Sequence, residues 1–309
     1  MKINEKTIGN GYPTYIIAEV GINHNGSLGI AKQLIQAASS AGVDAVKFQM
    51  RLLPRAIPPF MREQPKTLED GTVVTYLEYK ELLEFSTDEY YELADEAHGL
   101  GLDIGVSVWD TVSPHRAADM AYRDGEVGPP VFDFLKLPSA AIADEPIVHH
   151  AATRGLPFFW STGMYGMDQI ETTTNWLEEY GSTNWGVFHC NATYPANPAE
   201  LNLRVINNWK SYSLFGGHPI GYSGHEVGLA TTVAAVALGA DMVERHITLD
   251  RSMWGSDQSA SVEPDGFARL VRDIRAVESA LGDGKKVVWP SEQDKKDSLV
   301  VQTYLTKPS

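Results

Sequence analysis

The chain has 309 residues, 43% of them hydrophobic, and a formal net charge of −15. A chain of this length can bury one large core or two modest ones, and its acidic balance excludes nucleic acid as an expected partner, because nucleic-acid binding needs a basic surface. The sequence contains no run of about 18 apolar residues, so we expect no membrane span. The first residues are polar and contain no apolar signal-peptide core. The single cysteine, Cys190, can form no intrachain disulfide, so the expected compartment is a reducing cytoplasm.

Short apolar runs alternate with helical patterns along the whole sequence. Helical periodicity is clear at 28–42, 86–101 and 265–282, and Ser86 with Glu89 three residues later predicts a capping box for the second of these helices. The expected strands are 14–20, 45–49, 102–108, 132–137, 156–162, 185–190, 219–223 and 241–246. Eight strand–helix units predict an α/β fold, the (β/α)₈ TIM barrel.

Two further patterns bear on the organisation of the chain. An open doubly wound sheet is the alternative fold, but it needs a glycine-rich phosphate loop after an early strand, and "GINHNG" does not form one. We expect one catalytic barrel at 1–285 and a polar tail outside it at 286–309. The connection 50–85 is too long for an ordinary loop, so we expect a lid or a partly helical excursion.

Polar side chains gather where the predicted strands end. In a barrel of this kind the active site lies at the carboxyl ends of the strands, so these side chains are the candidate functional residues. In particular, we expect the run Glu244, Arg245 and His246 to face the mouth of the barrel. The others, in chain order, are Glu19, Lys47, Gln49, Ser107, Lys136, Ser139, Ser161, Tyr194, Ser223 and His225.

The residue types suggest the chemistry. Two lysines and several hydroxyls on neighbouring strands suit an anion with several oxygens, such as a phosphate with a carboxylate. A lysine inside a barrel is costly without a counter-anion, which favours a ligand anion beside Lys47. His225 and His246 end neighbouring strands, and two imidazoles with open coordination positions suit a catalytic Mn, Zn or Fe site. The carboxylates available for proton transfer or hydroxyl binding are Glu19, Glu244 and Asp257.

Each of these features also has a plainer explanation. A single histidine at a strand end is more often structural than catalytic, and Cys190 is more simply explained as a buried structural thiol than as a nucleophile.

A metal-dependent aldolase or isomerase on the same barrel is an alternative function, as is a non-catalytic protein that binds a sugar or phosphate. An aldolase of an uncharged donor has no need of paired lysines with three serines, which favours an anionic donor.

Five segments resemble the motifs of the sialic acid synthase family. They are "IIAEVGINHNGSLGIAKQLIQAASSAGVDAVKFQ", "STGM", "HCNATYP", "YSGHEVGLATTVAAVALGA" and "ERHITLDRSMWGSDQSAS", in the order that the family has them. The resemblance implies a TIM-barrel enzyme that condenses phosphoenolpyruvate with a sugar aldehyde, an aldose or an N-acylated aminosugar. Its product would be a 2-keto-3-deoxy sugar acid of the sialic-acid type, with release of phosphate.

The resemblance also implies roles for individual positions. The positions that match phosphoenolpyruvate contacts are Lys47, Ser107, Lys136, Ser139 and Ser161, with Gln49 and Ser223 beside them. His225 and His246 match the protein ligands of a divalent metal, for which Mn²⁺ is expected and Mg²⁺ or Co²⁺ are alternatives. Three positions match the region of the acceptor sugar and the new bond, and we expect catalytic roles there for Glu19, Tyr194 and Asp257.

The departures from the family pattern fall on the acceptor side. Ala141 stands where the family has an acceptor-binding glutamate, and Ala192 stands where a serine or asparagine is common; "VWD" and "GSDQ" also depart from it. The sequence ends at Ser309, where the family continues into an antifreeze-like domain, so we expect a short form without that domain. We therefore expect retained chemistry with an altered acceptor, which need not be N-acetylmannosamine. The assembly we expect is a homodimer formed through the barrel.

Overall fold

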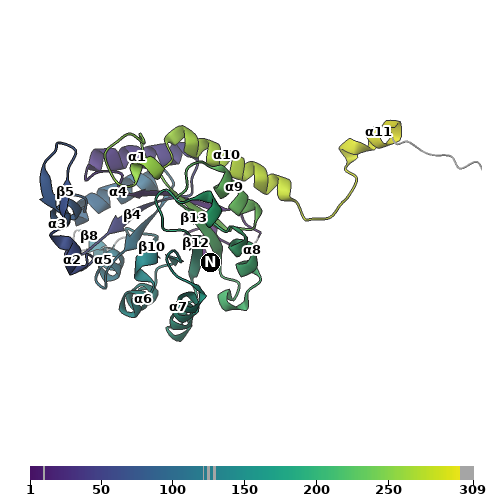
Figure 1. Cartoon of the computed structure of the whole chain (residues 1–309). Coiled ribbons are helices and arrows are strands. Elements are labelled where there is room, and N and C mark those ends of the chain that lie inside the picture. The colour runs from purple at the N-terminus through teal and green to yellow at the C-terminus, as the bar shows by residue number, and fades with distance from the viewer. Residues whose placement is uncertain (10, 121, 124–125, 128–129, 300–309) are drawn as a thin grey trace, which may run out of the picture.

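A closed barrel of eight parallel strands forms the centre of the computed structural model, which describes residues 1–9, 11–120, 122–123, 126–127 and 130–299 (Figure 1). The strands follow one another around the barrel in chain order. They are β3 (Tyr15–Gly21), β4 (Ala45–Met50), β7 (Asp103–Val108), β10 (Phe134–Leu137), β11 (Phe158–Ser161), β12 (Trp185–Cys190), β13 (Ile220–Gly224) and β14 (Met242–His246). The predicted (β/α)₈ fold is confirmed, and every predicted strand lies within two residues of an observed one at either end.

Helices cover the outside of the barrel between successive strands. Ser86 and Glu89 form the predicted capping box at the start of the second long helix. Gly42, at φ 82°, ends the first helix in the left-handed conformation that glycine adopts without strain. The α-helices are α1 (Leu28–Ala41), α4 (Thr87–Gly99), α5 (Ser113–Asp119), α6 (Glu145–Ala152), α7 (Met167–Glu179), α8 (Arg204–Lys210), α9 (Ala230–Ala237) and α10 (Pro264–Leu281). Short 3₁₀ helices are η1 (Ser139–Ala141), η2 (Pro198–Glu200), η3 (Ser213–Phe215) and η4 (Gln258–Ala260).

Large apolar side chains fill the amino-terminal half of the barrel interior. A hairpin of β1 (Lys2–Ile3) and β2 (Lys6–Thr7) adds Ile3 and Ile8 to this cluster from below. A Cβ at Gly105 would lie 2.2 Å from the ring of Phe134, so only glycine leaves room for that ring. The barrel residues of the cluster are Tyr15, Ile17, Ala45, Phe134, Phe159, Phe188 and Met242. They form an apolar floor, and the polar residues of the strands lie on its carboxyl-terminal side.

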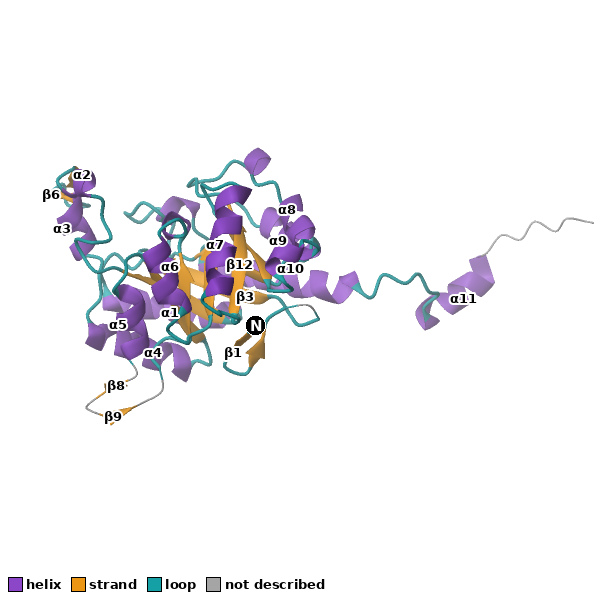
Figure 2. Ribbon diagram, turned by 90° about the horizontal axis from the view of Figure 1, so that it is seen from below, coloured by secondary structure: helices purple, strands orange, loops and turns teal. Residues whose placement is uncertain are grey.

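The connection between β4 and α4 is a partly helical excursion, as the sequence predicts. It contains α2 (Pro59–Arg62), the hairpin β5 (Pro65–Thr67) and β6 (Val73–Thr75), and α3 (Tyr76–Glu81). Figure 2 shows it standing at one side of the barrel. Tyr79 and Leu83 pack against Ile22 and Trp254, which belong to the connections after β3 and β14. The excursion is therefore anchored beside the carboxyl ends of the strands.

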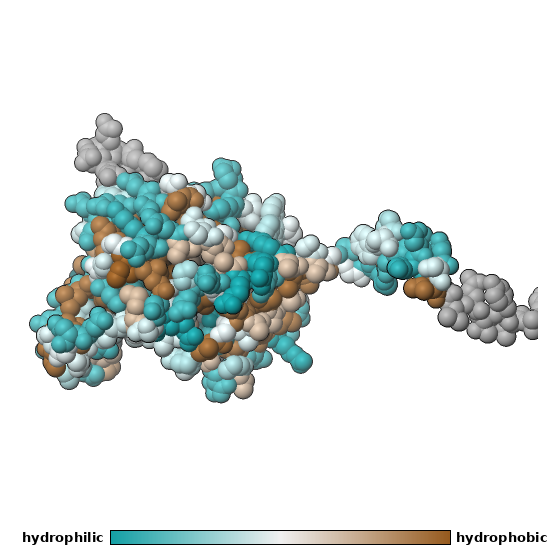
Figure 3. All heavy atoms as spheres, turned by 90° about the horizontal axis from the view of Figure 1, so that it is seen from above, coloured by the Kyte–Doolittle hydropathy of each residue, from teal (hydrophilic) through white to brown (hydrophobic). Residues whose placement is uncertain are grey.

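Two smaller elements lie outside the barrel. The hairpin of β8 (Tyr122–Arg123) and β9 (Glu126–Val127) follows α5, and α11 (Pro290–Leu299) follows α10 after an extended segment. No residue of α11 is buried, and Figure 3 shows it as a mostly hydrophilic lobe beside the body of the protein. Among the described residues, no helix has the length and apolar character needed to cross a membrane.

Candidate active site

The carboxyl ends of the barrel strands enclose a cavity of about 250 Å³, here called the barrel cavity. All but one of the predicted site residues line it. Those that do are Glu19, Lys47, Gln49, Ser107, Lys136, Ser139, Ser161, Tyr194, Ser223, His225 and His246. Asp257 is the exception; it follows β14 and lies at the edge, with one carboxylate oxygen 3.7 Å from Nδ1 of His246.

Strand register explains why these side chains meet. His246 of β14 is paired with Glu19 of β3, and Glu19 is paired with Lys47 of β4. Ser107 of β7 is paired with Lys136 of β10 in the same way. Paired residues on neighbouring parallel strands point to the same face of a sheet, and the face here is the barrel interior. The strands therefore form one continuous polar layer above the apolar floor.

Two buried lysines and two buried glutamates form the centre of this layer. Nζ of Lys47 lies 2.5 Å from Oε2 of Glu19 and 3.7 Å from Oε2 of Glu244, and it donates to Oγ of Ser107 at 2.6 Å. Nζ of Lys136 donates to Oε1 of Glu244 at 2.5 Å. The chain itself supplies two carboxylates beside Lys47, so the cost of burying this lysine does not by itself indicate a ligand anion. Glu244 lines the cavity as the sequence predicts, and its carboxylate lies between both lysines, a contact that the sequence did not indicate.

The charges of this layer are strongly coupled. Burial alone would raise the pKa of Glu244, but Lys136 and Lys47 lower it to about 2. Burial lowers the pKa of Lys136, and the Glu244 carboxylate opposes this shift. All four residues have exposed fractions of 3% or less. Because each lysine lies beside a glutamate carboxylate, an incoming anion would compete with the glutamates for the lysines.

Serine hydroxyls supply further donors around the lysines. Oγ of Ser161 is buried and has no hydrogen-bond partner within the described part of the chain. Oγ of Ser139 accepts a hydrogen bond from the backbone N–H of Gly163 at 2.9 Å and donates a weak one to Sγ of Cys190 at 3.9 Å. Ser223 donates to Oε1 of Glu244 at 3.1 Å. An unpaired buried hydroxyl costs free energy, so Ser161 indicates a position for a ligand acceptor.

Two histidines face each other across the opposite side of the cavity. The ring centroids of His225 and His246 are 5.6 Å apart. Nδ1 of His225 donates to the backbone oxygen of Asn191 at 2.6 Å, so its Nε2 carries the lone pair; burial and then His246 lower its pKa to about 3. Nε2 of His225 accepts from the Tyr194 hydroxyl at 2.7 Å, and Nδ1 of His246 is buried without a hydrogen-bond partner.

This arrangement fits a divalent metal with two protein ligands. Neutral imidazoles are the form that binds metals, and a second-shell bond from Nδ1 orients the ring, as the backbone of Asn191 does for His225. Within the described residues, no three side chains of His, Cys, Asp and Glu are grouped to hold a metal ion. The remaining coordination positions would belong to water or substrate, which is the pattern of a catalytic rather than a structural site.

Arg245 does not face the mouth of the barrel, and that part of the prediction is wrong. It points outward, with an exposed fraction of 1%, and its Nη1 donates to Oε1 of Glu226 at 3.1 Å and to Oγ1 of Thr232 at 2.8 Å. Tyr222 donates to the other oxygen of Glu226 at 2.7 Å. Successive side chains of a strand alternate in direction, so Glu244 and His246 point inward while Arg245 supports the helix layer.

Glu226→Gln should destabilise the fold without affecting the cavity. The substitution leaves the buried guanidinium of Arg245 without its counter-ion, which we expect to lower the free energy of unfolding by about 3–5 kcal/mol. Urea denaturation would measure the change. Glu171→Gln is the control, because the carboxylate of Glu171 accepts from the Tyr212 hydroxyl at the surface, and we expect a change within about 0.5 kcal/mol. Equal stability of the two variants would contradict a structural role for the pair.

Cys190 should be unreactive in the folded protein. Burial raises the pKa of its thiol to about 11, and the nearby Lys136 opposes the shift only in part. At pH 8 only about 0.1% would be thiolate. We expect iodoacetamide to leave the native protein unmodified at pH 8 and to alkylate the urea-denatured protein, as intact-mass measurements would show. Rapid alkylation of the native protein would restore the nucleophile alternative.

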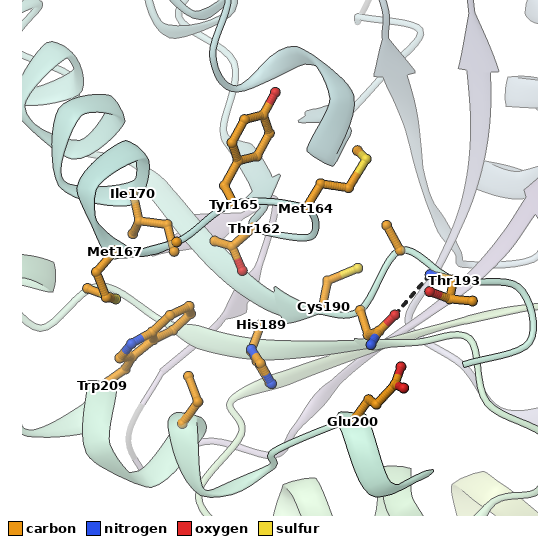
Figure 4. Close-up of a pocket in the computed structure, with 14 residues that line it drawn as sticks. Thr162, Met164, Tyr165, Met167, Ile170, His189, Cys190, Thr193, Glu200 and Trp209 are labelled. Carbon is orange, nitrogen blue, oxygen red and sulfur yellow. Dashed lines mark hydrogen bonds between the residues drawn. The ribbon is translucent and has the colours of Figure 1, made fainter. Parts of the chain in front are cut away.

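A second cavity, of about 520 Å³, adjoins the first and was not predicted. Met164, Cys190 and Ala192 line both cavities. Figure 4 shows Met167, Ile170 and Trp209 on one side of this space and the carboxylate of Glu200 near its other end. Ala192, one of the departures from the family pattern, therefore lies between the two cavities. Ala141 does not line the barrel cavity; its neighbour Ala140 does.

The fold and the site together define an enzyme built on a (β/α)₈ barrel, with paired lysines, serine hydroxyls and two facing histidines at the carboxyl ends of its strands. Residues 34–286 match the NeuB family. The chain belongs to this family, whose members are synthases that form a carbon–carbon bond with phosphoenolpyruvate.

Individual relatives support the same placement. The N-acetylneuraminate-9-phosphate synthases of Mus musculus and Homo sapiens are each 39% identical over 94% of this chain and 78% of their own length. The N,N'-diacetyllegionaminic acid synthase of Legionella pneumophila is 31% identical over 99% of this chain and 83% of its own length. An N-acetylneuraminic acid (sialic acid) synthetase from Leptospira borgpetersenii, solved with citrate, superposes with a TM-score of 0.81 at 28% identity and covers 97% of this chain and 96% of its own.

Proposed function

We propose that the enzyme condenses phosphoenolpyruvate with the aldehyde of an aminosugar and releases phosphate. The product would be a 2-keto-3-deoxy sugar acid of the kind that the relatives' names describe. The observation that carries the proposal is the pair Lys47 and Lys136, buried beside the unpartnered hydroxyl of Ser161 and opposite His225 and His246. A polyanionic donor on the lysine side and an aldehyde oxygen on the histidine side would place the reacting carbons within one cavity.

Each part of the cavity has a distinct task in this reaction. Lys47 and Lys136 would bind the phosphate and carboxylate of phosphoenolpyruvate, with hydroxyl donors from Ser107, Ser139 and Ser161. C3 of phosphoenolpyruvate attacks the aldehyde carbon, and a carbon–carbon bond forms while positive charge develops at C2. Water then adds at C2, and breaking the C2–O bond of the tetrahedral intermediate expels phosphate.

Glu19 is placed to act at the reacting centre. Its Oε2 lies 2.5 Å from Nζ of Lys47, and the amide of Gln49 donates to its Oε1 at 3.0 Å, which fixes its orientation. His246 is its partner on the neighbouring strand. An ionised carboxylate at this position would stabilise the cation at C2 and orient the attacking water. A divalent cation held by His225 and His246 would supply Lewis-acid polarisation of the aldehyde oxygen. The hydroxyl of Tyr194, whose pKa burial raises well above its ordinary value, stays protonated as a donor beside them.

The acceptor is the part of the proposal that goes beyond the family. Ala192 offers no polar group at the wall between the two cavities, and the second cavity adds apolar space bounded by Met167 and Trp209. We therefore propose an acceptor other than unmodified N-acetylmannosamine. Homodimer assembly and a cytoplasmic location remain predictions from sequence.

Phosphate release from phosphoenolpyruvate tests this function. Purified enzyme with Mn²⁺ would be given pentoses, hexoses, N-acetylhexosamines, diacetamido sugars and their phosphates. We expect release that depends on one class of aldose and yields a 2-keto-3-deoxy acid. Selective turnover of N-acetylmannosamine would contradict the altered acceptor. Absence of phosphoenolpyruvate binding would contradict the condensation itself and favour an aldolase or a binding protein.

A further inference from the structure

Trp109 lines the barrel cavity and brings to it a buried hydrogen-bond donor that the proposed reaction leaves unused. Its indole Nε1 is buried, and within the part of the chain that the structure describes it has no hydrogen-bond partner. A buried donor left unpaired costs free energy, so such groups find an acceptor in the protein, in ordered water or in a ligand. Because this nitrogen belongs to a residue of the cavity wall, a bound substrate can supply the acceptor.

Trp160 differs from Trp109 in this respect. Its indole Nε1 is also buried without a partner among the described residues. Its ring, however, lies in the apolar layer between the strands and the helices, with 6.0 Å between its centroid and that of Trp185. Trp160 lines neither the barrel cavity nor the second cavity, so a ligand in these cavities has no access to its N–H.

Trp109 stands above the lysine layer, toward the mouth of the barrel. It directly follows β7 and lines the cavity as Ser107 does, two residues earlier. A strand rises about 3.3 Å per residue, so Trp109 lies about 6–7 Å closer to the mouth than Ser107. In the proposed reaction the lysines and serines hold phosphoenolpyruvate, so the level above them faces the acceptor sugar. Trp109 is also the middle residue of "VWD", where the sequence departs from the family pattern.

Two sets of contacts hold the indole ring in this place. The guanidinium carbon of Arg51 lies over the ring, 4.6 Å from its centroid, and Glu84 anchors Arg51 through Nη1 at 3.0 Å. The next residue, Asp110, fixes the backbone, because its carboxylate accepts from the backbone N–H groups of Val112 at 2.8 Å and Leu52 at 2.7 Å. A ring held at its face and at its backbone presents the N–H in a fixed direction, which lowers the entropic cost of binding.

The groups around Trp109 favour a ligand oxygen that carries no proton. An indole N–H is a donor only, so the ligand atom must be an acceptor. The amide of Gln49 is engaged at both ends, since its Oε1 accepts from Arg51 and its Nε2 donates to Glu19. Pro138 and Ala140, which also line the cavity, have no polar side-chain atoms. The proton of a sugar hydroxyl would find no free acceptor among these side chains, whereas a carbonyl oxygen brings no proton.

We propose that the indole N–H of Trp109 donates to the carbonyl oxygen of an N-acyl group on the acceptor sugar, which makes Trp109 a specificity-determining residue. The assignment rests on the proposed condensation and names the group that selects an N-acylated aldose over the corresponding hydroxyl sugar. A sugar without the carbonyl leaves the N–H unpaired and is therefore bound less well. The other source of an oxygen without a proton is the carboxylate or phosphate of phosphoenolpyruvate.

Trp109→Phe tests the assignment, because it removes the N–H and keeps an aromatic ring. Phosphate release with Mn²⁺ and phosphoenolpyruvate would compare N-acetylmannosamine with mannose, and 2,4-diacetamido-2,4,6-trideoxymannose with 6-deoxymannose. We expect the wild type to prefer the N-acylated sugar, and Trp109→Phe to lower this preference, as a ratio of kcat/KM values, by about 10–30-fold. The KM for phosphoenolpyruvate should change less than about 3-fold, because that substrate binds at the deeper level.

Trp160→Phe is the matched control, because it removes an equally buried indole N–H that lies outside the cavity. It should lower stability and keep the ratio of the two sugars. An equal loss for both sugars in Trp109→Phe would mean that the ring only packs, and would overturn the proposal. A raised KM for phosphoenolpyruvate with an unchanged ratio would also overturn it, because the N–H would then belong to the phosphoenolpyruvate site.

Failure of the proposed function gives a different result, which is no turnover with any of these sugars. In that case, calorimetry of N-acetylmannosamine and mannose with the wild-type protein and Trp109→Phe decides the matter. Tighter binding of N-acetylmannosamine than of mannose, lost in Trp109→Phe, supports the role of Trp109. Equal or absent binding of the two sugars overturns it.

Discussion

His246→Ala should abolish metal-dependent turnover, with a loss of at least about 10³-fold in kcat. His246 and His225 are the facing imidazoles of the cavity, and Nδ1 of His246 is a buried nitrogen without a hydrogen-bond partner. Removing one of two protein ligands leaves a single imidazole, which is too weak to retain the ion. Phosphate release and the Mn²⁺ content of the dialysed protein would be measured together.

The readouts separate a metal role from a structural one. A variant that only disturbs packing would lose stability but keep its bound Mn²⁺ per folded molecule. His149→Ala is the control, because His149 lies exposed on α6 and packs its ring against Tyr180, away from the cavity; it should keep both Mn²⁺ and activity. Full activity of His246→Ala would remove His246 from the metal site.

Lys47→Met should raise the KM for phosphoenolpyruvate by about 100-fold, because it removes one of the two cations available to the donor. The same change leaves Glu19 without the ammonium that lies 2.5 Å from its carboxylate, so we also expect a loss of about 3–5 kcal/mol in the free energy of unfolding. Calorimetry with phosphoenolpyruvate on the folded variant, at a temperature well below its Tm, would separate the two effects.

Lys210→Met is the matched control for this prediction. Lys210 forms a similar ion pair, 2.6 Å from Asp241, but at the amino-terminal end of β13 and β14. The Lys210→Met variant should therefore lose stability and keep its affinity for phosphoenolpyruvate. Wild-type affinity in Lys47→Met would show that the donor does not bind at the lysine layer, and the anionic-donor assignment would then be wrong.

The barrel could be predicted because its signals are local. Alternation of apolar strands with amphipathic helices needs no knowledge of distant contacts, and the capping box of Ser86 and Glu89 is contained within four residues. Once the barrel is accepted, residues at strand ends share one face, so the lysines, serines and histidines could be assigned to one cavity. Lys47 and Gln49 both line it because side chains two apart on a strand point the same way.

Contacts between distant segments had to come from the tertiary structure. Glu244 meets Lys136 across the barrel, 108 residues away in sequence, which is why internal counter-ions for the lysines were not foreseen. Arg245 turns outward to Glu226 because successive side chains of a strand point to opposite faces, and its partner Glu226 lies 19 residues away in sequence.

The sequence by itself determined the fold and the membership of the cavity, since both follow from periodicity and from the common direction of barrel strands. Only the tertiary structure decided which charges neutralise each other. The physical reason is that charge pairing depends on distances of a few ångström between side chains that the chain brings together only when it is folded.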